Sequence, residues 1–153
     1  MLTPGMYSSH SCEWETPQEF FDRLDDIYHF DLDVCATAQN TKCSRYFTRA
    51  QDGLSQNWAP CRCWMPPPYG TEIKEWVEKA SESETLVVGL LPARLETQWF
   101  NKHVYGKAEI IIVEKRLRFG GGASTAPFGS IVAVWNDHTV DLAALTQLKR
   151  MVA

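Results

Sequence analysis

The sequence predicts an α/β domain with a mainly parallel sheet flanked by helices. Three observations support this class. Amphipathic helical segments alternate with short strands, two continuous apolar runs suit strands buried on both faces, and 153 residues fit a single domain. Residues 1–13 contain Pro, Gly and Ser with little periodicity. We therefore expect a flexible arm at residues 1–13 and one domain at residues 14–153.

The first predicted helix and strand lie between residues 16 and 34. Thr16-Pro17-Gln18-Glu19 has the pattern of a capping box with proline at the first helical position. Apolar residues follow at helical spacing, namely Phe20, Phe21, Leu24, Ile27 and Tyr28. Alternation over residues 30–34 predicts a strand with Asp33 near its carboxyl end. The polar stretch at residues 37–58 predicts a long connection with a turn at Asp52-Gly53.

The second half of the chain predicts a strand at residues 61–65, a stiff loop, and a helix with Thr71 as its N-cap. The buried face of that helix is predicted to contain Ile73, Trp76, Val77 and Ala80. Apolar runs at residues 85–91 and 108–113 predict two buried strands, joined by a helical segment around residues 95–103. A segment at 116–119, a Gly120-Gly121-Gly122 break, a strand at 130–135 and a helix at about 140–151 complete the chain.

Composition excludes several classes of protein. A net charge of −4 argues against gripping nucleic acid through bulk charge, although a local basic face is compatible with it. Five cysteines without a paired C-x-x-C favour neither a disulfide framework nor a zinc ribbon, so we expect no metal. No apolar run approaches the roughly 20 residues of a membrane span, and the N-terminus lacks the features of a leader. These patterns predict a cytoplasmic protein without membrane contact.

Basic residues gather in two clusters, each with aromatic neighbours: Lys42, Arg45 and Arg49, and Lys115, Arg116 and Arg118. Either cluster is equally compatible with a solvated surface.

The run Trp64-Met65-Pro66-Pro67-Pro68-Tyr69-Gly70 indicates a ligand-facing loop. Proline fixes its own φ and restricts the residue before it, so the loop is stiff without internal hydrogen bonds. Ligands of open α/β sheets bind beyond the carboxyl ends of the strands, where both Asp33 and this loop are expected. The alternative is a polyproline II segment that turns the chain or is bound by a proline-recognition domain.

Taken together, these residues resemble the phage-type DNA N-6-adenine-methyltransferase (Dam-like) family, and the resemblance runs nearly end to end. The matching motifs are Trp14-x-Thr16-Pro17-x-x-Phe20-Phe21, Phe30-Asp31-Leu32-Asp33-Val34-Cys35-Ala36, Asn40, Tyr46-Phe47-Thr48, Asp52-Gly53-Leu54, Trp58, Pro67-Pro68-Tyr69-Gly70, Trp76-Val77, Leu91-Pro92-Ala93-Arg94, Trp99-Phe100, Arg116-x-Arg118-Phe119-Gly120 and Ala126-Pro127-x-Gly129-Ser130.

The resemblance implies a Rossmann-like, S-adenosylmethionine-dependent methyltransferase fold. It also implies transfer of a methyl group from S-adenosylmethionine to the exocyclic amino group of adenine in DNA. The implied partner is DNA and the implied setting is protection of phage DNA against restriction in the host cell cytoplasm. A cytosine amino group has the same chemistry, and the sequence does not fix the recognition sequence or the oligomeric state.

The resemblance assigns the catalytic loop to Pro66, Pro67, Pro68 and Tyr69, but the first position departs from the family. Related enzymes carry Asn or Asp there, whose side-chain oxygen accepts one amino hydrogen of the target base while the next proline's carbonyl accepts the other. The tyrosine stacks on the base after it leaves the duplex. Pro66 has no side-chain acceptor.

The resemblance also implies which residues contact the cofactor and the substrate. Cofactor contacts are expected from Thr16, Pro17, Asp33, Cys35, Ala36 and Asp52. Substrate contacts are expected from Tyr69, Arg116, Arg118 and Phe119. Asp33 would face the cofactor's amino group and Asp52 its adenosine part, although Asp52-Gly53 is also a common turn.

Three explanations of Pro66 stay open at this point. The chain is a binding-competent but impaired homologue, an active variant in which Asp33, Asp52 or another group supplies the acceptor, or a substituted form of an active parent. The rival to an active methyltransferase is a non-catalytic module that keeps the fold and binds cofactor or DNA.

Overall fold

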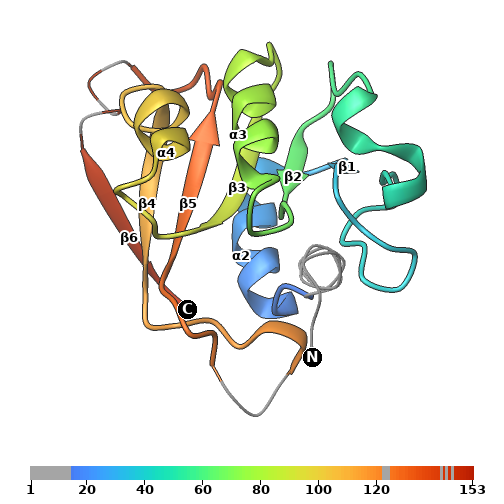
Figure 1. The fold of residues 1–153 in the computed structure, drawn as a ribbon, viewed down its shortest axis with the longest axis horizontal. Coiled ribbons are helices and arrows are strands. Elements are labelled where there is room, and N and C mark those ends of the chain that lie inside the picture. The colour runs from blue at the N-terminus through green and yellow to red at the C-terminus, as the bar shows by residue number, and fades with distance from the viewer. Residues whose placement is uncertain (1–14, 122–124, 142, 144, 146) are drawn as a thin grey trace.

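A six-stranded mixed sheet lies at the centre of the fold (Figure 1). The computed structural model describes residues 15–121, 125–141, 143, 145 and 147–153. The predicted arm at residues 1–13 lies outside the described residues. The strands are β1 (Leu32–Asp33), β2 (Cys63–Met65), β3 (Val87–Pro92), β4 (Ala108–Glu114), β5 (Ser130–Trp135) and β6 (Leu148–Val152).

The sheet has the strand order β1-β2-β3-β5-β4-β6. The pairs β1–β2, β2–β3 and β4–β6 are parallel, whereas β5 pairs antiparallel with both β3 and β4. The α/β class is therefore confirmed, but the sheet is mixed. The departure from a parallel sheet comes from β5, which inserts between β3 and β4 and runs against them.

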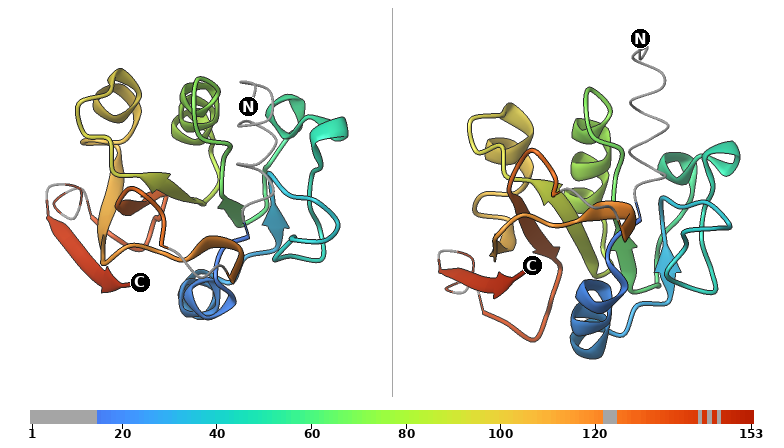
Figure 2. Two further views of the ribbon diagram at one scale, coloured as in Figure 1. Left: turned by 60° about the horizontal axis from the view of Figure 1, so that its bottom comes forward. Right: turned by 90° about the horizontal axis from the view of Figure 1, so that it is seen from below.

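Helices cover both faces of the sheet (Figure 2). Helices α3 (Ile73–Glu82) and α4 (Gln98–His103) lie on one face, and α2 (Gln18–Tyr28) lies on the other. Two apolar clusters fill the layers on either side of the sheet. Within the described residues, no helix is long and apolar enough to pass through a bilayer.

The helical faces follow the sequence pattern with specific exceptions. Helix α3 buries all four residues predicted for its face, but its N-cap is Glu72 rather than Thr71. Helix α2 begins at Gln18, after Pro17, and its N-cap makes no side-chain hydrogen bond, so the predicted capping box is wrong. Ile27 is 64% exposed, because the apolar spacing of α2 extends one position beyond the stripe that meets the sheet.

The predicted C-terminal helix at about 140–151 is wrong where the structure describes it. Residues 148–152 form β6, which pairs in parallel with β4 from Ile110↔Leu148 to Glu114↔Val152. Pairing with β4 satisfies the backbone hydrogen-bonding groups of this short segment better than one isolated helical turn would. No local periodicity in the sequence indicates the strand. Tertiary context therefore decides this element.

A partly buried ion pair fixes β6 to the sheet. Lys149 Nζ lies 2.6 Å from Glu109 Oε2, and the Glu109 side chain is 3% exposed. The second carboxylate oxygen of Glu109 has no hydrogen-bond partner among the described residues. Loss of the ammonium would therefore leave a buried charge without compensation.

We predict that Lys149→Met lowers the free energy of unfolding by about 1–3 kcal/mol, because the Glu109 carboxylate loses its counter-ion. Urea unfolding followed by tryptophan fluorescence measures this change. The double variant Glu109→Gln, Lys149→Met should recover most of the loss, and Lys102→Met on the exposed surface of α4 is the control. Equal losses in the Lys149 and Lys102 variants would contradict the role of the pair.

Candidate functional site

The site is built where two adjacent parallel strands end. β1 and β2 are in register from Leu32↔Cys63 to Asp33↔Trp64, so the loops that follow them leave from the same edge of the sheet. The segment at residues 45–47 extends this edge, since Phe47 N donates to Asp33 O at 2.9 Å and Asp33 N donates to Arg45 O at 3.0 Å. The long connection between β1 and β2 thus folds back against the end of β1.

The Asp33 carboxyl group lies beneath this edge and organises the backbone above it. It is 1% exposed and accepts hydrogen bonds from the backbone N–H of Lys42 at 3.1 Å and of Cys35 at 3.3 Å. Burial raises the pKa of Asp33 to about 7, against the lowering effect of these two hydrogen bonds and of the Lys42 charge. Asp33 is not among the residues that line the nearby pocket.

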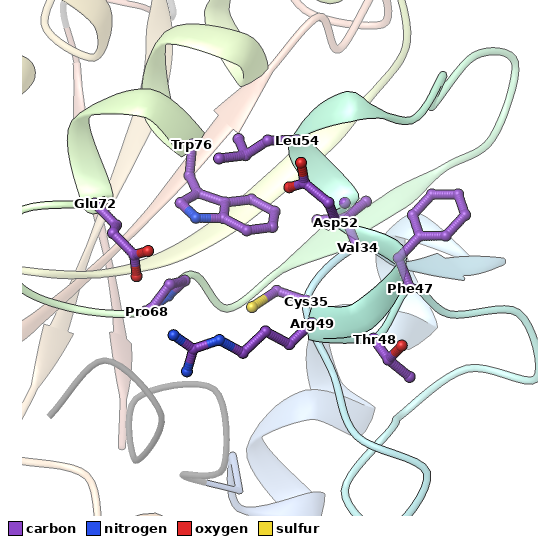
Figure 3. A pocket seen from close by; sticks show the side chains of 11 residues that line it. Val34, Cys35, Phe47, Thr48, Arg49, Asp52, Leu54, Pro68, Glu72 and Trp76 are labelled. Carbon is purple, nitrogen blue, oxygen red and sulfur yellow. The ribbon is translucent and has the colours of Figure 1, made fainter. Parts of the chain in front are cut away.

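A pocket lies above Asp33, between the end of β1, the 3-10 helices η1 (Arg49–Gln51) and η2 (Gly53–Ser55), and helix α3 (Figure 3). Its cavity volume is about 80 Å³, and the empty space around it, open solvent included, is about 450 Å³. The lining residues are Val34, Cys35, Phe47, Thr48, Arg49, Asp52, Gly53, Leu54, Pro68, Glu72 and Trp76.

The floor of the pocket depends on close backbone approach at Gly53. A Cβ at this position would lie 2.2 Å from the carbonyl oxygen of Val34 and 3.0 Å from the Trp76 ring, so a larger residue does not fit. Asp52 precedes it in the left-handed region with φ of 53° and separates the two 3-10 helices. The Asp52-Gly53 turn therefore shapes the pocket and also contributes a carboxylate to it.

The pocket combines both signs of charge with an apolar wall. Arg49 supplies a guanidinium, Asp52 and Glu72 supply carboxylates, and the Trp76 ring lies between the two acids (Figure 3). The carboxylate of Glu72 points toward Pro68, whereas that of Asp52 lies on the other side of the indole. Such a lining suits a zwitterionic ligand with an aromatic or apolar part.

The proline loop forms one wall of the pocket and leads to an aromatic cluster. Pro66 is half-buried, while Pro67 and Pro68 are buried. The Tyr69 hydroxyl donates to Leu90 O at 3.3 Å, and burial raises the Tyr69 pKa. Its ring packs edge-on against Phe128 and Phe119, with centroids 5.4 and 6.4 Å apart. We call Tyr69, Phe119 and Phe128 the aromatic cluster.

The cations of the 115–118 segment lie in a second depression, which we call the basic groove. It is lined by Pro17, Glu19, Phe20, Arg23, Lys115, Arg116, Leu117, Arg118, Thr125 and Ala153. Its lining is distinct from that of the pocket above Asp33.

The structure brings together some of the residues predicted for the site and separates others. Cys35, Asp52 and Pro68 line one pocket, and Tyr69 with Phe119 forms the aromatic cluster. The remaining predicted cofactor residues do not line that pocket: Thr16, Asp33 and Ala36 are buried, and Pro17 lines the basic groove with Arg116 and Arg118.

Sequence reasoning missed Arg49, Glu72, Trp76 and Phe128 as site residues. Arg49 begins the short 3-10 helix η1 and Glu72 is the N-cap of α3, so neither belongs to a periodic helical face. The helical spacing of Trp76 assigns it to the core. Phe128 stood at an unassigned position between Pro127 and Gly129. Among the residues that the structure describes, no three His, Cys, Asp or Glu side chains form a candidate metal site.

Comparison with known proteins gives consistent matches. A family model described as DNA N-6-adenine-methyltransferase (Dam) matches residues 6–150. The chain is 34% identical over 112 residues to the DNA N-6-adenine-methyltransferase of Haemophilus phage HP1 (strain HP1c1), covering 69% of this chain and 65% of the relative. It is 30% identical over 109 residues to the protein of the same name from Escherichia phage T1, covering 68% and 45%. The chain thus spans less than two thirds of either relative's length.

We predict that Asp33 makes stability depend on pH. Its pKa rises from an ordinary value of 3.8 to about 7 on folding, so between these values the folded state binds more protons than the unfolded state. Stability contributed by protonated Asp33 is therefore lost as pH rises through this window. Urea unfolding at pH 5 and pH 8 should show the wild-type chain losing stability relative to Asp33→Asn, which cannot titrate. Parallel pH profiles for the two proteins would refute this.

Proposed function

The chain belongs to the DNA N-6-adenine-methyltransferase (Dam) family, and from this premise we propose that it transfers a methyl group from S-adenosylmethionine to the exocyclic amino group of adenine in DNA. The observation that supports this most strongly is the adjacency of two sites. Pro68 lines the pocket at the end of β1, and the next residue, Tyr69, belongs to the aromatic cluster. A transfer reaction between a cofactor and a flipped base needs such an arrangement.

The proposal extends to the fold and its setting. The mixed sheet is a reduced Rossmann-like methyltransferase sheet, in which the β1–β2–β3 order places the pocket at the carboxyl ends of β1 and β2. Residues 14–153 act as one methyltransferase domain. The enzyme works in the host cell cytoplasm, where methylation protects phage DNA against restriction.

The lining of the pocket fits S-adenosylmethionine. Arg49 would pair with the cofactor carboxylate, and Asp52 would hold its ammonium group or ribose hydroxyls. Trp76 and Leu54 would provide an apolar wall for the adenine ring of the cofactor. Asp33 acts from below by holding the loop that carries Cys35. When bound, the cofactor supplies an electrophilic methyl group on a sulfonium.

The proline loop positions the nucleophile. The adenine amino nitrogen is weakly nucleophilic because its lone pair is delocalised into the ring, and hydrogen-bond acceptors on its two hydrogens concentrate that lone pair on nitrogen. The carbonyl of Pro67 accepts one hydrogen, and Tyr69 stacks on the base. Once the amino nitrogen has accepted the methyl group, it would carry a positive charge and would have to release one proton.

Glu72 is the group best placed to replace the acceptor that Pro66 lacks. Asp33 is buried and engaged with backbone donors, and the Asp52 carboxylate lies on the far side of Trp76. The Glu72 carboxylate lines the same pocket as Pro68 and points toward it (Figure 3). It therefore accepts the second amino hydrogen and takes the proton after transfer.

The first test is transfer of labelled methyl from S-adenosylmethionine to unmethylated DNA, with cofactor binding measured on the same protein. We expect labelled adenine from the wild-type chain, and a change of less than about tenfold in Pro66→Asn because Glu72 already supplies an acceptor. Cofactor binding without transfer, restored by Asn at position 66, would instead identify a non-catalytic module. Failure of both proteins to bind the cofactor would remove the assignment of the pocket.

We predict that Glu72→Gln lowers the rate of methyl transfer about 100- to 1,000-fold, the usual effect of deleting one stabilising group. Its affinity for S-adenosylmethionine should fall less than that of Asp52→Asn, because the Glu72 carboxylate points toward Pro68. Asp52→Asn is the matched control and should weaken cofactor affinity.

Adding Pro66→Asn to Glu72→Gln should restore part of the rate, since an amide oxygen again faces the amino group. Equal loss of rate in the single and double variants would exclude Glu72 as the compensating acceptor.

A further inference from the structure

The basic groove concentrates positive charge on an acidic protein. Four of the chain's 15 Lys and Arg residues line it, while the net charge of the whole chain is −4. Glu19 is the acidic side chain in its described lining. The groove contains about 860 Å³ of empty space, much of it open to solvent. A depression lined by several cations attracts extended anions.

Two structural elements supply the cations. Helix α2 contributes Arg23, whose guanidinium lies 5.3 Å from the Phe20 ring centroid and donates to Val152 O at 2.6 Å. The Nε of Arg23 is buried without a partner among the described residues. Arg23 therefore holds a fixed position at the side of the groove, at some cost in unsatisfied hydrogen bonding.

The segment at residues 115–118 supplies the other three cations in a fixed backbone frame. Leu117 is buried, and its carbonyl accepts from Ala126 N at 2.8 Å, while Glu114 O accepts from Ala153 N at 2.9 Å. The backbone on both sides of the segment is thus hydrogen-bonded. With Leu117 facing inward, the side chains of Lys115, Arg116 and Arg118 are exposed.

The groove is continuous in sequence with the aromatic cluster. Arg118 lines the groove, and the next residue, Phe119, packs against Tyr69 with ring centroids 6.4 Å apart. Gly120 N also donates to Glu15 O at 2.8 Å, which ties this segment to the chain leading into α2. An anion in the groove would therefore lie next to the place where the proposed function puts the target base.

From these observations we propose that the basic groove binds the phosphate backbone of the DNA strand next to the flipped adenine. The proposal rests on the proposed function for the identity of the polymer. Arg116 and Arg118 then act on phosphates instead of on the target base, with Arg23 and Lys115 as further contacts. Fixed, exposed guanidinium and ammonium groups are the usual partners of phosphate oxygens, and such contacts position DNA without reading its sequence.

The test compares two double variants that remove the same charge. Lys115→Gln with Arg116→Gln changes the groove, and Lys102→Gln with Lys107→Gln changes exposed lysines of α4 and the turn after it. Arg23 stays unchanged because it also holds the Val152 carbonyl. Binding of a fluorescent duplex containing adenine is measured without cofactor between 50 and 300 mM salt. The logarithm of the binding constant falls linearly with the logarithm of the salt concentration, and we call this dependence the salt slope. Each phosphate contact adds about 0.9 to it.

We expect the salt slope of the groove variant to fall by the equivalent of about two phosphate contacts. Its affinity for the duplex should be on the order of 10- to 100-fold lower near 0.1 M salt. The control should stay within about threefold of wild type, and both variants should keep wild-type affinity for S-adenosylmethionine. Equal weakening of both variants, or an unchanged salt slope in the groove variant, would overturn the proposal.

The outcome separates the groove from the catalytic assignment. Groove-dependent duplex binding in a protein that transfers no methyl group would support the groove and refute the proposed activity. Methyl transfer by wild type together with an unchanged salt slope in the groove variant would refute the groove and leave the activity standing.

Discussion

The buried carboxyl group of Asp33 is the interaction on which the rest of the site depends. β1 contains two residues, so its backbone hydrogen bonds to β2 cannot by themselves fix the 29 residues between the end of β1 and the start of β2. Asp33 accepts from the backbone of Cys35 and of Lys42, and its main chain pairs with Arg45 and Phe47. One residue thereby holds both the first turn of the connection and its return to the sheet.

Fixing that connection determines where the charges of the pocket lie. Once the chain returns at Phe47, the two 3-10 helices follow and carry Arg49 and Asp52 to the rim. Gly53 then packs directly on the carbonyl of Val34, and the Trp58 indole donates to Gly53 O at 2.9 Å. The pocket is therefore preorganised by backbone contacts that exist without a ligand, which lowers the entropic cost of binding.

Sequence patterns predicted the parts of this fold that follow a single period. The four buried residues of α3 and the bounds of β5 match their apolar spacing, since each element packs one regular face or is buried on both. β6 was missed because its strand character comes from pairing with β4. The role of Arg49 is missed because its position depends on the long connection between β1 and β2, whose path follows from the contacts of Asp33 and Gly53 and not from any repeat. Glu72 is missed because it is the N-cap of α3 and stands outside the periodic face of that helix.

Pro66 fits this preorganised design in one respect and conflicts with it in another. A third consecutive proline stiffens the loop, so the carbonyl groups that we propose to face the base would lose little freedom on binding. Proline at this position also lacks the side-chain oxygen that the family resemblance leads us to expect there. A rigid loop with a missing acceptor is productive only if a neighbouring group faces the same point. The N-terminal end of α3 brings the Glu72 carboxylate toward Pro68. In the proposed function, methyl transfer therefore depends on the first turn of α3, which lies outside the four-residue motif at residues 66–69.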